Sequence, residues 1–425
     1  IWIDPKDSNR MIVTCDGGTV VTLTGGKTWS SFANQSGVQF YRVDTDDEFP
    51  YRVYGNAQDL LVYSIPSASI WGGIPLHMTN YIGNGETGSA IPKPGDPNIV
   101  YSLSTGATFG GATMFTVNNL ETGQTQPRPI WPEVQFGTPA SEFKYRFNWQ
   151  APFLVSPHDP NTIYFAGNVV FRSRDEGMTW ETISDDLTHN MTDKMKVAGS
   201  EWLPEYFGQE TFSTIHRLAE SPHEEGVLWA GTDDGRVWIT RDGGGPWTEV
   251  TPPGLPELSG VYEIEVSPHD KATTYLAITR YRKADDYAPY LLKTPDYGKT
   301  WKRIDDGFPK GQVTKTIRED TVRQGLLFVG TETGVYASID DGATWRKMNL
   351  NMPPLPVFDI EIKNADVVIA THGMGFWILD DISPLRQYAP EIAQKKAHLF
   401  EPETHTRFGY NWWVDYGGGP PSEEK

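Results

Sequence analysis

The octapeptide Ser338-Ile339-Asp340-Asp341-Gly342-Ala343-Thr344-Trp345 occurs several times along the chain in related forms. Residues 173–180 and 294–301 keep the same pattern, which is Ser/Thr-x-Asp-x-Gly-x-Thr-Trp. Residues 22–29 and 240–247 each depart from it at one position. Several copies of one short pattern in a single chain predict a fold that is assembled from a repeated structural unit.

Each residue type that the copies of the pattern share has a physical role in a β-hairpin. The aspartate can accept hydrogen bonds from backbone N–H groups of its own turn, and the glycine adopts a backbone conformation that a Cβ would penalise. The tryptophan resumes the strand and buries a large ring between neighbouring sheets. The pattern resembles the Asp-box (bacterial neuraminidase, BNR) repeat of β-propellers. We therefore expect a structural role for its aspartates and tryptophans, namely Asp175, Asp242, Asp296, Asp340, Trp29, Trp180, Trp247, Trp301 and Trp345.

The spacing of the repeats sets the size of the unit. Successive pattern aspartates are separated by 242−175 = 67, 296−242 = 54 and 340−296 = 44 residues, which suits a four-stranded blade with variable loops. A second repeat, a turn followed by an apolar strand, begins at residues 156, 221 and 267 and in four looser copies. The sequence thus predicts an all-β Asp-box propeller of about seven blades, or part of a larger or tandem propeller. We expect it to occupy residues 1–383, with a tail over residues 384–425 that closes the ring or leads to a further domain.

Composition restricts the partners. Asp and Glu number 55 against 36 Lys and Arg, giving a net charge of −19, so nucleic acid and anionic membranes are poor partners. Cys15 is the single cysteine, which excludes an intrachain disulfide. The sequence contains no apolar run of the roughly 18 to 20 residues that a membrane span needs. Because Ile1-Trp2-Ile3 already alternates like a strand, we expect the chain to be a piece of a longer or processed polypeptide.

Several motifs outside the repeat resemble the bacterial sortilin-like BNR-repeat "glycosyl hydrolase" family of exported envelope proteins. They are residues 54–59, residues 144–149 followed by 156–160, residues 231–235 and residues 371–381. The resemblance implies a propeller and a secreted, periplasmic or cell-surface location. It supplies no set of catalytic residues, because relatives with this repeat include both hydrolases and peptide-binding proteins.

Two regions lack the repeat, and function tends to lie in such insertions. We expect residues 71–73, 81–86 and 131–133 to be long loops, and a second insertion over residues 184–214. Their aromatic side chains could stack on sugar rings or form pockets for peptide side chains, although propeller cores also bury tryptophan. The candidate ligand-binding residues are Trp71, Tyr81, Trp131, Arg146, Trp149, Trp202 and Tyr206.

Carboxylates outside the repeat are candidates for glycoside cleavage, which needs two carboxyl groups about 5 to 9.5 Å apart, one with a raised pKa. The candidate catalytic residues are Asp59, Glu86, Glu205 and Glu210, each with turn capping as the alternative interpretation. His216 and His372 are the least repetitive histidines, and a core or loop role is the simpler interpretation for both. The acidic run Asp44–Glu48 could hold a structural Ca²⁺, and a solvated loop is the alternative. No other cofactor is expected.

Three hypotheses follow. The leading one is an extracytoplasmic binding or scaffold module that holds a glycan or a polypeptide on its loop-bearing face. The alternative is a glycoside hydrolase acting on a polysaccharide through a carboxylate pair. The third is a structural subunit that associates with other subunits or with the missing portion of the same protein.

Overall fold

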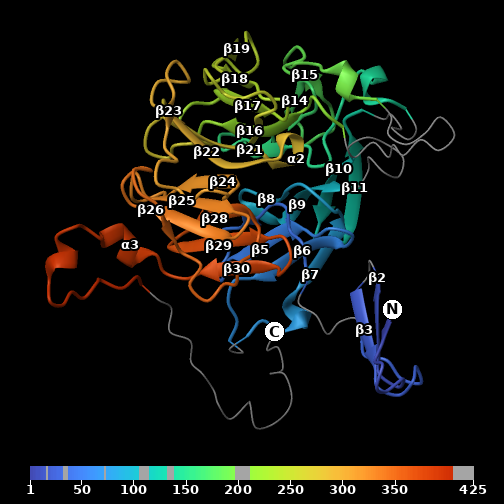
Figure 1. The fold of residues 1–425 in the computed structure, drawn as a ribbon. Helices are drawn as coiled ribbons and strands as arrows, with labels where there is room; N and C mark the ends of the chain where they lie inside the picture. The colour runs from blue at the N-terminus through green and yellow to red at the C-terminus, as the bar shows by residue number, and fades with distance from the viewer. Residues whose placement is uncertain are drawn as a thin grey trace.

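The computed structural model describes residues 1–15, 18–31, 37–70, 73–104, 114–131, 138–196 and 211–404. The described residues form eight antiparallel sheets, and seven of them follow one another from Asp44 to Leu379 (Figure 1). These seven sheets are the blades of a β-propeller. Each packs against the next through its first strand.

The first three blades have four strands each. Blade 1 consists of β4 (Asp44–Thr45), β5 (Arg52–Asn56), β6 (Leu61–Pro66) and β7 (Asn80–Asn84). Blade 2 consists of β8 (Ala90–Lys93), β9 (Asp96–Ser104), β10 (Met114–Asn119) and β11 (Gln124–Pro129). Blade 3 consists of β12 (Phe153–Val155), β13 (Ile163–Ala166), β14 (Val170–Ser173) and β15 (Glu181–Thr182).

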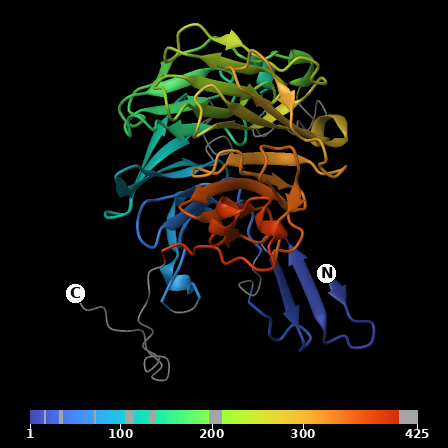
Figure 2. The same cartoon turned by 90° about the vertical axis from the view of Figure 1, so that its left-hand side faces the viewer.

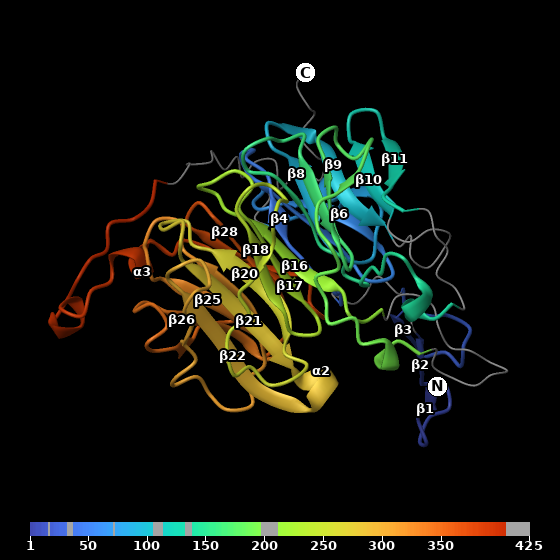
Figure 3. The same cartoon turned by 90° about the horizontal axis from the view of Figure 1, so that it is seen from above.

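The remaining blades complete the ring, and Figures 1 and 3 place β25–β26 across the molecule from β8–β11. Blade 4 consists of β16 (Ile215–Glu220), β17 (Leu228–Thr232), β18 (Val237–Thr240) and β19 (Thr248–Glu249). Blade 5 consists of β20 (Gly260–Val266), β21 (Thr274–Arg280), β22 (Asp286–Thr294) and β23 (Lys302–Arg303). Blade 6 consists of β24 (Thr314–Glu319), β25 (Leu327–Thr331), β26 (Gly334–Ser338) and β27 (Arg346–Lys347). Blade 7 has three strands, β28 (Val357–Lys363), β29 (Asp366–Thr371) and β30 (Phe376–Leu379).

Helical segments are short among the described residues. They are α2 (Tyr281–Ala284), α3 (Ser383–Gln387) and the 3₁₀ turns η2 (Leu76–Met78), η3 (Ala140–Glu142), η4 (Thr192–Lys194) and η5 (Ile392–Gln394). No helix in the described part of the chain is long and apolar enough to span a membrane.

Blade 1 meets blade 7 and closes the ring. The Phe40 ring stacks on Phe376 at 3.7 Å between ring centres, and Phe40 donates its backbone N–H to Thr371. Val43, Val53 and other buried apolar residues of blade 1 pack against Val368 and Ala370 of blade 7 in one cluster. Packing and hydrogen bonds close the ring without a disulfide, because the single cysteine, Cys15, is free.

The aspartate–tryptophan hairpins connect the third and fourth strands of blades 3, 5 and 6 in the same way. In the hairpin that follows β26, Asp340 Oδ1 accepts the Thr344 N–H at 2.8 Å and Oδ2 accepts the Thr344 hydroxyl at 2.7 Å. The Ser338 hydroxyl accepts the Gly342 N–H at 2.9 Å. Asp175 and Asp296 make the equivalent bonds in their own hairpins, so each turn is satisfied by residues at most four positions apart.

The hairpin tryptophans also join blades. The indole N–H groups of Trp247, Trp301 and Trp345 donate to the carbonyls of Ile183, Val250 and Ile304, each of which follows the last strand of the preceding blade. The histidines of the second repeat make a similar link, since His158, His223 and His269 place Nε2 within 2.7 to 3.0 Å of a carbonyl in the next blade. Both repeats therefore connect neighbouring blades on one face of the ring, which we call the hairpin face.

Two expectations from the sequence are wrong here. Residues 80–84 form the outermost strand of blade 1, so Tyr81 lies on a strand and not in a long loop. One of the four looser copies of the second repeat, the turn at Asp4–Asp7, was expected to lead into a blade but belongs to a separate sheet, whereas blade 1 carries neither repeat. The segment around Asp4 consequently contributes no blade to the seven-bladed ring.

That separate sheet consists of β1 (Trp2–Ile3), β2 (Met11–Cys15) and β3 (Gly18–Thr22), and it pairs with no strand of the ring. Figures 1 and 2 show it beside the propeller. Trp29 follows β3 in a hairpin like those of the blades, but among the described residues its indole N–H donates to the Gly26 carbonyl of its own turn and not to another blade. Large apolar side chains stay exposed on this sheet, among them Trp2, Ile3, Leu23 and Trp29.

Candidate functional site

The innermost strands of blades 4 to 7 share one irregularity. Each pairs with its second strand in a register that shifts at the same place, and the residues left unpaired there are His216, Tyr262, Lys315 and Phe358. A β-bulge redirects a side chain and occurs often beside functional sites. Four bulges at equivalent positions of adjacent inner strands bring four side chains to the end of the central channel opposite the hairpin face.

These four side chains lie along an arc in which two groups of residues make contacts. His216 stacks on Tyr262 at 4.2 Å between ring centres, and the Lys315 ammonium lies 3.5 Å from the centre of the Phe358 ring. Phe358 stacks on His372 at 4.3 Å, and His372 meets Tyr41 edge-on at 4.9 Å. We call this arc, with Tyr281, Arg282 and the residues described next, the channel mouth.

Two candidate carboxylates from the sequence lie at the channel mouth. Asp59 is in the turn between β5 and β6, and Glu86 is in the connection from blade 1 to blade 2. Burial, and then the negative charge of Asp59, raises the pKa of Glu86 above its usual range. Gln58 accepts a hydrogen bond from the Tyr41 hydroxyl at 2.5 Å and donates one to Asp59 at 2.9 Å, which links Asp59 to the arc.

Burial also lowers the pKa of three basic side chains at the channel mouth. It is the main cause that lowers the pKa of His372 to about 4 and that of Lys315 to about 8, with Glu332 opposing the shift at 2.8 Å from the lysine. His216 has a pKa well below its usual range for the same reason. Within the described residues, His216 Nδ1 and His372 Nε2 are buried without a hydrogen-bond partner. Each ring therefore has one nitrogen whose hydrogen-bonding capacity is unused in the folded chain.

Below the channel mouth, the channel is closed by a buried ion network. Glu263 lies between Arg217 at 2.6 Å, Arg318 at 2.9 Å and Arg42 at 3.4 Å, and its side chain has no exposed surface. Arg318 also bonds Asp359 at 2.8 Å. Burial opposes the charge of Glu263, but the three guanidinium groups outweigh it and hold the pKa of this carboxyl below its usual range.

The next layer of the channel holds more carboxyl groups than guanidinium groups. Burial is the first cause that raises the pKa of Glu265 to about 8 and that of Glu361 to about 7. Burial and the charges of Glu361 and Asp359 also raise the pKa of Asp44 well above its usual range. One guanidinium, that of Arg318, lies between Glu265 at 3.6 Å and Asp359, so the folded protein retains protons here at neutral pH.

We therefore expect the free energy of unfolding to fall as the pH rises from 6.5 to 8. Glu265 binds a proton in the folded chain and loses it in the unfolded chain above about pH 4.5, so the unfolded state binds fewer protons in this range. One such group lowers the stability by about 2 kcal/mol over 1.5 pH units. The neutral histidines act in the opposite direction only below about pH 6.5.

Urea denaturation at several pH values measures this effect. The Glu265→Gln variant has no proton to lose at this position and should show a flatter pH profile than the wild type. A stability that rises between pH 6.5 and 8 would contradict the protonated state of this layer.

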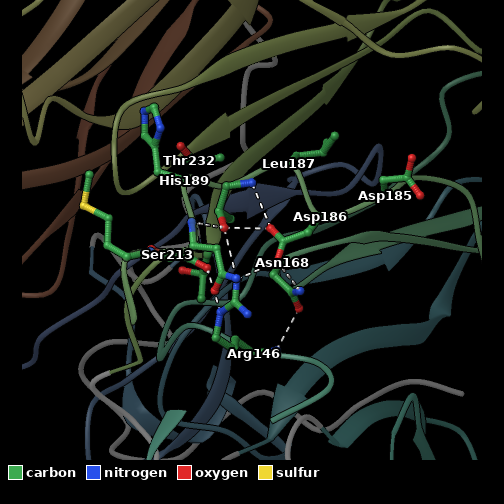
Figure 4. A network of polar contacts seen from close by, with 12 residues as sticks. Arg146, Asn168, Asp185, Asp186, Leu187, His189, Ser213 and Thr232 are labelled. Carbon is green, nitrogen blue, oxygen red and sulfur yellow. Dashed lines mark hydrogen bonds and ion pairs between the residues drawn. The ribbon is translucent and has the colours of Figure 1, made fainter. Parts of the chain in front are cut away.

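Arg146 was a candidate ligand-binding residue, but its guanidinium makes hydrogen bonds to other groups of the protein. Its guanidinium donates to Asp186 at 2.7 Å, to the Thr188 hydroxyl at 3.0 Å and to the Ser213 carbonyl at 3.2 Å. Figure 4 shows Arg146 directed into this network together with Asn168. The network holds the connection after blade 3 to the body of the ring.

The other candidates are dispersed. Trp149 lies at the channel mouth, within reach of the Tyr41 hydroxyl. Trp131 packs edge-on against Tyr145 under the Lys144 ammonium, and Tyr81 lies on the outer edge of blade 1. The remaining candidates fall outside the described residues, namely Trp71, Trp202, Tyr206, Glu205 and Glu210.

The acidic run Asp44–Glu48 is the candidate Ca²⁺ site of the sequence analysis. Asp46 accepts the Arg52 N–H at 2.8 Å and the Tyr54 hydroxyl at 2.8 Å, and Asp47 pairs with Lys363. Among the described residues, no group of three or more His, Cys, Asp or Glu side chains is arranged to hold a metal ion. These contacts assign the run to the stabilisation of blade 1.

The sequence reasoning did not identify Tyr41, Tyr262, Lys315 and Phe358. A signal for three of them was present, because Tyr262, Lys315 and Phe358 occupy one position of the inner strand, where His216 stands in blade 4. This position varies in chemistry within an otherwise repetitive segment. Variation at one repeat position is expected where side chains from several blades form a single site.

Comparison with known proteins relates the chain to xyloglucan-cleaving enzymes at low identity. It is 22% identical over 280 residues to xyloglucanase Xgh74A of Acetivibrio thermocellus, covering 55% of this chain and 31% of that protein. It is 24% identical over 162 residues to the oligoxyloglucan-reducing end-specific xyloglucanase of Emericella nidulans, covering 35% and 17% of the two chains. The chain thus spans less than a third of the length of these relatives. No protein-family model matches it.

Solved structures support the same fold. The GH74 xyloglucanase of Xanthomonas campestris superposes with a TM-score of 0.59 and 14% identity, over 85% of this chain and 54% of that one. An ancestral GH74 enzyme superposes with a TM-score of 0.57 and 13% identity, over 83% and 46%. This chain therefore has the β-propeller fold that occurs in glycoside hydrolases.

Proposed function

We propose that this chain is a glycan-binding propeller whose ligand occupies the channel mouth. The observation that carries the proposal is the arc of aromatic rings and neutral imidazoles that four strand bulges direct to one end of the channel. Aromatic rings stack on sugar rings, and neutral imidazoles can bond hydroxyl groups. The relatives named as xyloglucanases favour a glycan over a polypeptide as the ligand.

A polysaccharide ligand also implies a location. Polysaccharides are too large and too polar to cross a membrane unaided, so a protein that binds an extracellular polysaccharide must meet it outside the cytoplasm. We accordingly place this chain in the periplasm, on the cell surface or in the medium.

Replacement of Trp149 by alanine should weaken glycan binding about 5- to 100-fold, since stacking on one aromatic ring contributes on the order of 1 to 3 kcal/mol. Trp149 is half-buried beside Tyr41, so the fold should tolerate the change. Isothermal titration with xyloglucan oligosaccharides and with a peptide pool measures the loss. Trp29→Ala is the matched control, because Trp29 lies on the separate N-terminal sheet. Equal affinities for wild type and Trp149→Ala would contradict a ligand at the channel mouth.

A second candidate function is hydrolysis of the bound glycan. It rests on Asp59 and Glu86, which interact through their charges at the channel mouth, and on the raised pKa of Glu86. A carboxyl group with a raised pKa can donate its proton to the leaving oxygen, while an ionised partner activates water or attacks the sugar. In this scheme Glu86 is the general acid and Asp59 is the general base or the nucleophile.

A further inference from the structure

The outer edge of blade 7 has no strand beside it in the described part of the chain. Blades 1 to 6 have four strands each, whereas blade 7 ends at β30 after three. All four residues of β30 are half-buried, although every residue of the equivalent strand β26 in blade 6 is buried. An uncovered edge presents unpaired N–H and C=O groups, to which another extended segment can add.

The unpaired backbone groups of this edge belong to Phe376 and Ile378. The Gly375 carbonyl points toward β29, where it accepts the Thr371 N–H at 3.1 Å. Because the backbone groups of successive strand residues alternate in direction, those of Phe376 and Ile378 point away from β29. No described residue makes a hydrogen bond to these outward groups. The edge of β30 can therefore accept a further strand.

The contact between blades 6 and 7 also lacks a hairpin tryptophan. At the equivalent contact between blades 5 and 6, the Trp345 indole donates to the Ile304 carbonyl, which follows the last strand of blade 5. Met348 has this position after β27, because its N–H donates to Val335 at 2.8 Å as the Ile304 N–H does to Leu291 at 3.0 Å. Among the described residues, no hydrogen bond reaches the Met348 carbonyl. An acceptor for one indole N–H is therefore unused at this contact.

The chain leaves blade 7 without forming the missing strand, and it then returns to the same end of the blade. Arg386 of α3 pairs with Asp320 of blade 6 at 2.7 Å and donates to the carbonyl of Asn364, in the turn between β28 and β29. Glu403 lies 3.8 Å from the Arg386 guanidinium. The chain at residue 403 is consequently at the hairpin face, beside the end of blade 7.

We infer that residues 411–416 of this chain, Asn-Trp-Trp-Val-Asp-Tyr, add to β30 as the fourth strand of blade 7. These residues lie outside the part of the chain that the structure describes. Tryptophan, valine and tyrosine favour strands, and the run ends at residues 417–421, which are glycine and proline only. The chain between residues 403 and 411 can span about 25 Å, so the segment starts within reach of the blade.

The direction of the chain suits this strand. β30 ends at the hairpin face, so a segment that starts there runs antiparallel to it, as the fourth strands of blades 3 to 6 run to their third strands. Trp412 then has the place of a hairpin tryptophan and donates its indole N–H to the Met348 carbonyl. Side chains alternate between the faces of a strand, so Trp412 and Val414 face blade 6, whereas Trp413 and Asp415 face the other side.

Hydrogen exchange of the full chain, resolved by residue, tests this strand. In the wild type the Ile378 amide should be protected, because it donates to the added strand. Trp412→Ser with Val414→Ser should raise its exchange rate at least about ten-fold, since the side chains that pack on blade 6 are lost. Trp413→Ser with Asp415→Ser is the matched control and should leave the rate within about two-fold of the wild type. The amides of β28 should be unchanged in each variant, which shows that the ring stays folded.

Three outcomes overturn the inference. A wild-type Ile378 amide that exchanges as fast as an open edge shows that nothing covers β30. Protection that both tail variants leave unchanged shows that residues 32–36 or a second copy of the chain covers the edge. Dilution separates these two, because only protection by a second copy is lost on dilution. Equal loss of protection in the two tail variants contradicts a strand with one face packed on blade 6.

Discussion

Replacement of Glu263 by glutamine is expected to lower the free energy of unfolding by about 3 to 5 kcal/mol, the usual effect of removing one partner of a buried ion pair. Glu263 has no exposed surface and lies between the guanidinium groups of Arg42, Arg217 and Arg318. Glutamine preserves the volume but removes the charge, so these buried cations lose their common partner. Urea denaturation at pH 7 measures the loss.

The matched control is Glu265→Gln on the same strand, two residues away and on the same face. Because the pKa of Glu265 is raised to about 8, this side chain is mostly neutral at pH 7, and glutamine replaces a group of similar shape and charge. We expect a change of less than about 1 kcal/mol. Equal losses in the two variants would show that the charge of Glu263 is not what holds the channel together.

Replacement of Glu86 by glutamine is expected to reduce glycan cleavage about 10²- to 10⁴-fold, the usual contribution of a general acid, if the chain is a hydrolase. The Asp59→Asn variant should lose activity as well, because the base or nucleophile is removed. Both variants should keep glycan affinity within about three-fold, since neither side chain supplies the aromatic surface. Release of reducing ends from a panel of neutral polysaccharides measures the cleavage.

The pH profile gives an independent check of the roles. The rate should fall as the pH rises through the raised pKa of Glu86, because the acid must be protonated to act. Glu225→Gln, an exposed carboxylate of a repeat turn on the hairpin face, is the control and should have wild-type activity. If the wild-type chain binds glycans and releases no reducing ends, the hydrolase candidate is rejected and binding remains.

The local features could be predicted from the sequence because their hydrogen bonds are local. The turns of Asp175, Asp296 and Asp340 are closed by residues two and four positions away, so the residues that make the turn also identify it. Asp59 and Glu86 could be proposed because they are carboxylates outside the repeat, and both lie at the channel mouth. Tyr81 was identified as a ligand-binding candidate, but its strand was taken for a loop because no repeat marks blade 1.

The sequence by itself determined the all-β class, the four-stranded unit and the hairpins that join neighbouring blades. Only the tertiary structure decided where the channel mouth lies and which side chains meet there. Tyr41 and Phe358 are separated by more than 300 residues and come together because the ring closes. Their contacts, and the pKa shifts that follow from burial, depend on that closure and not on neighbours in sequence.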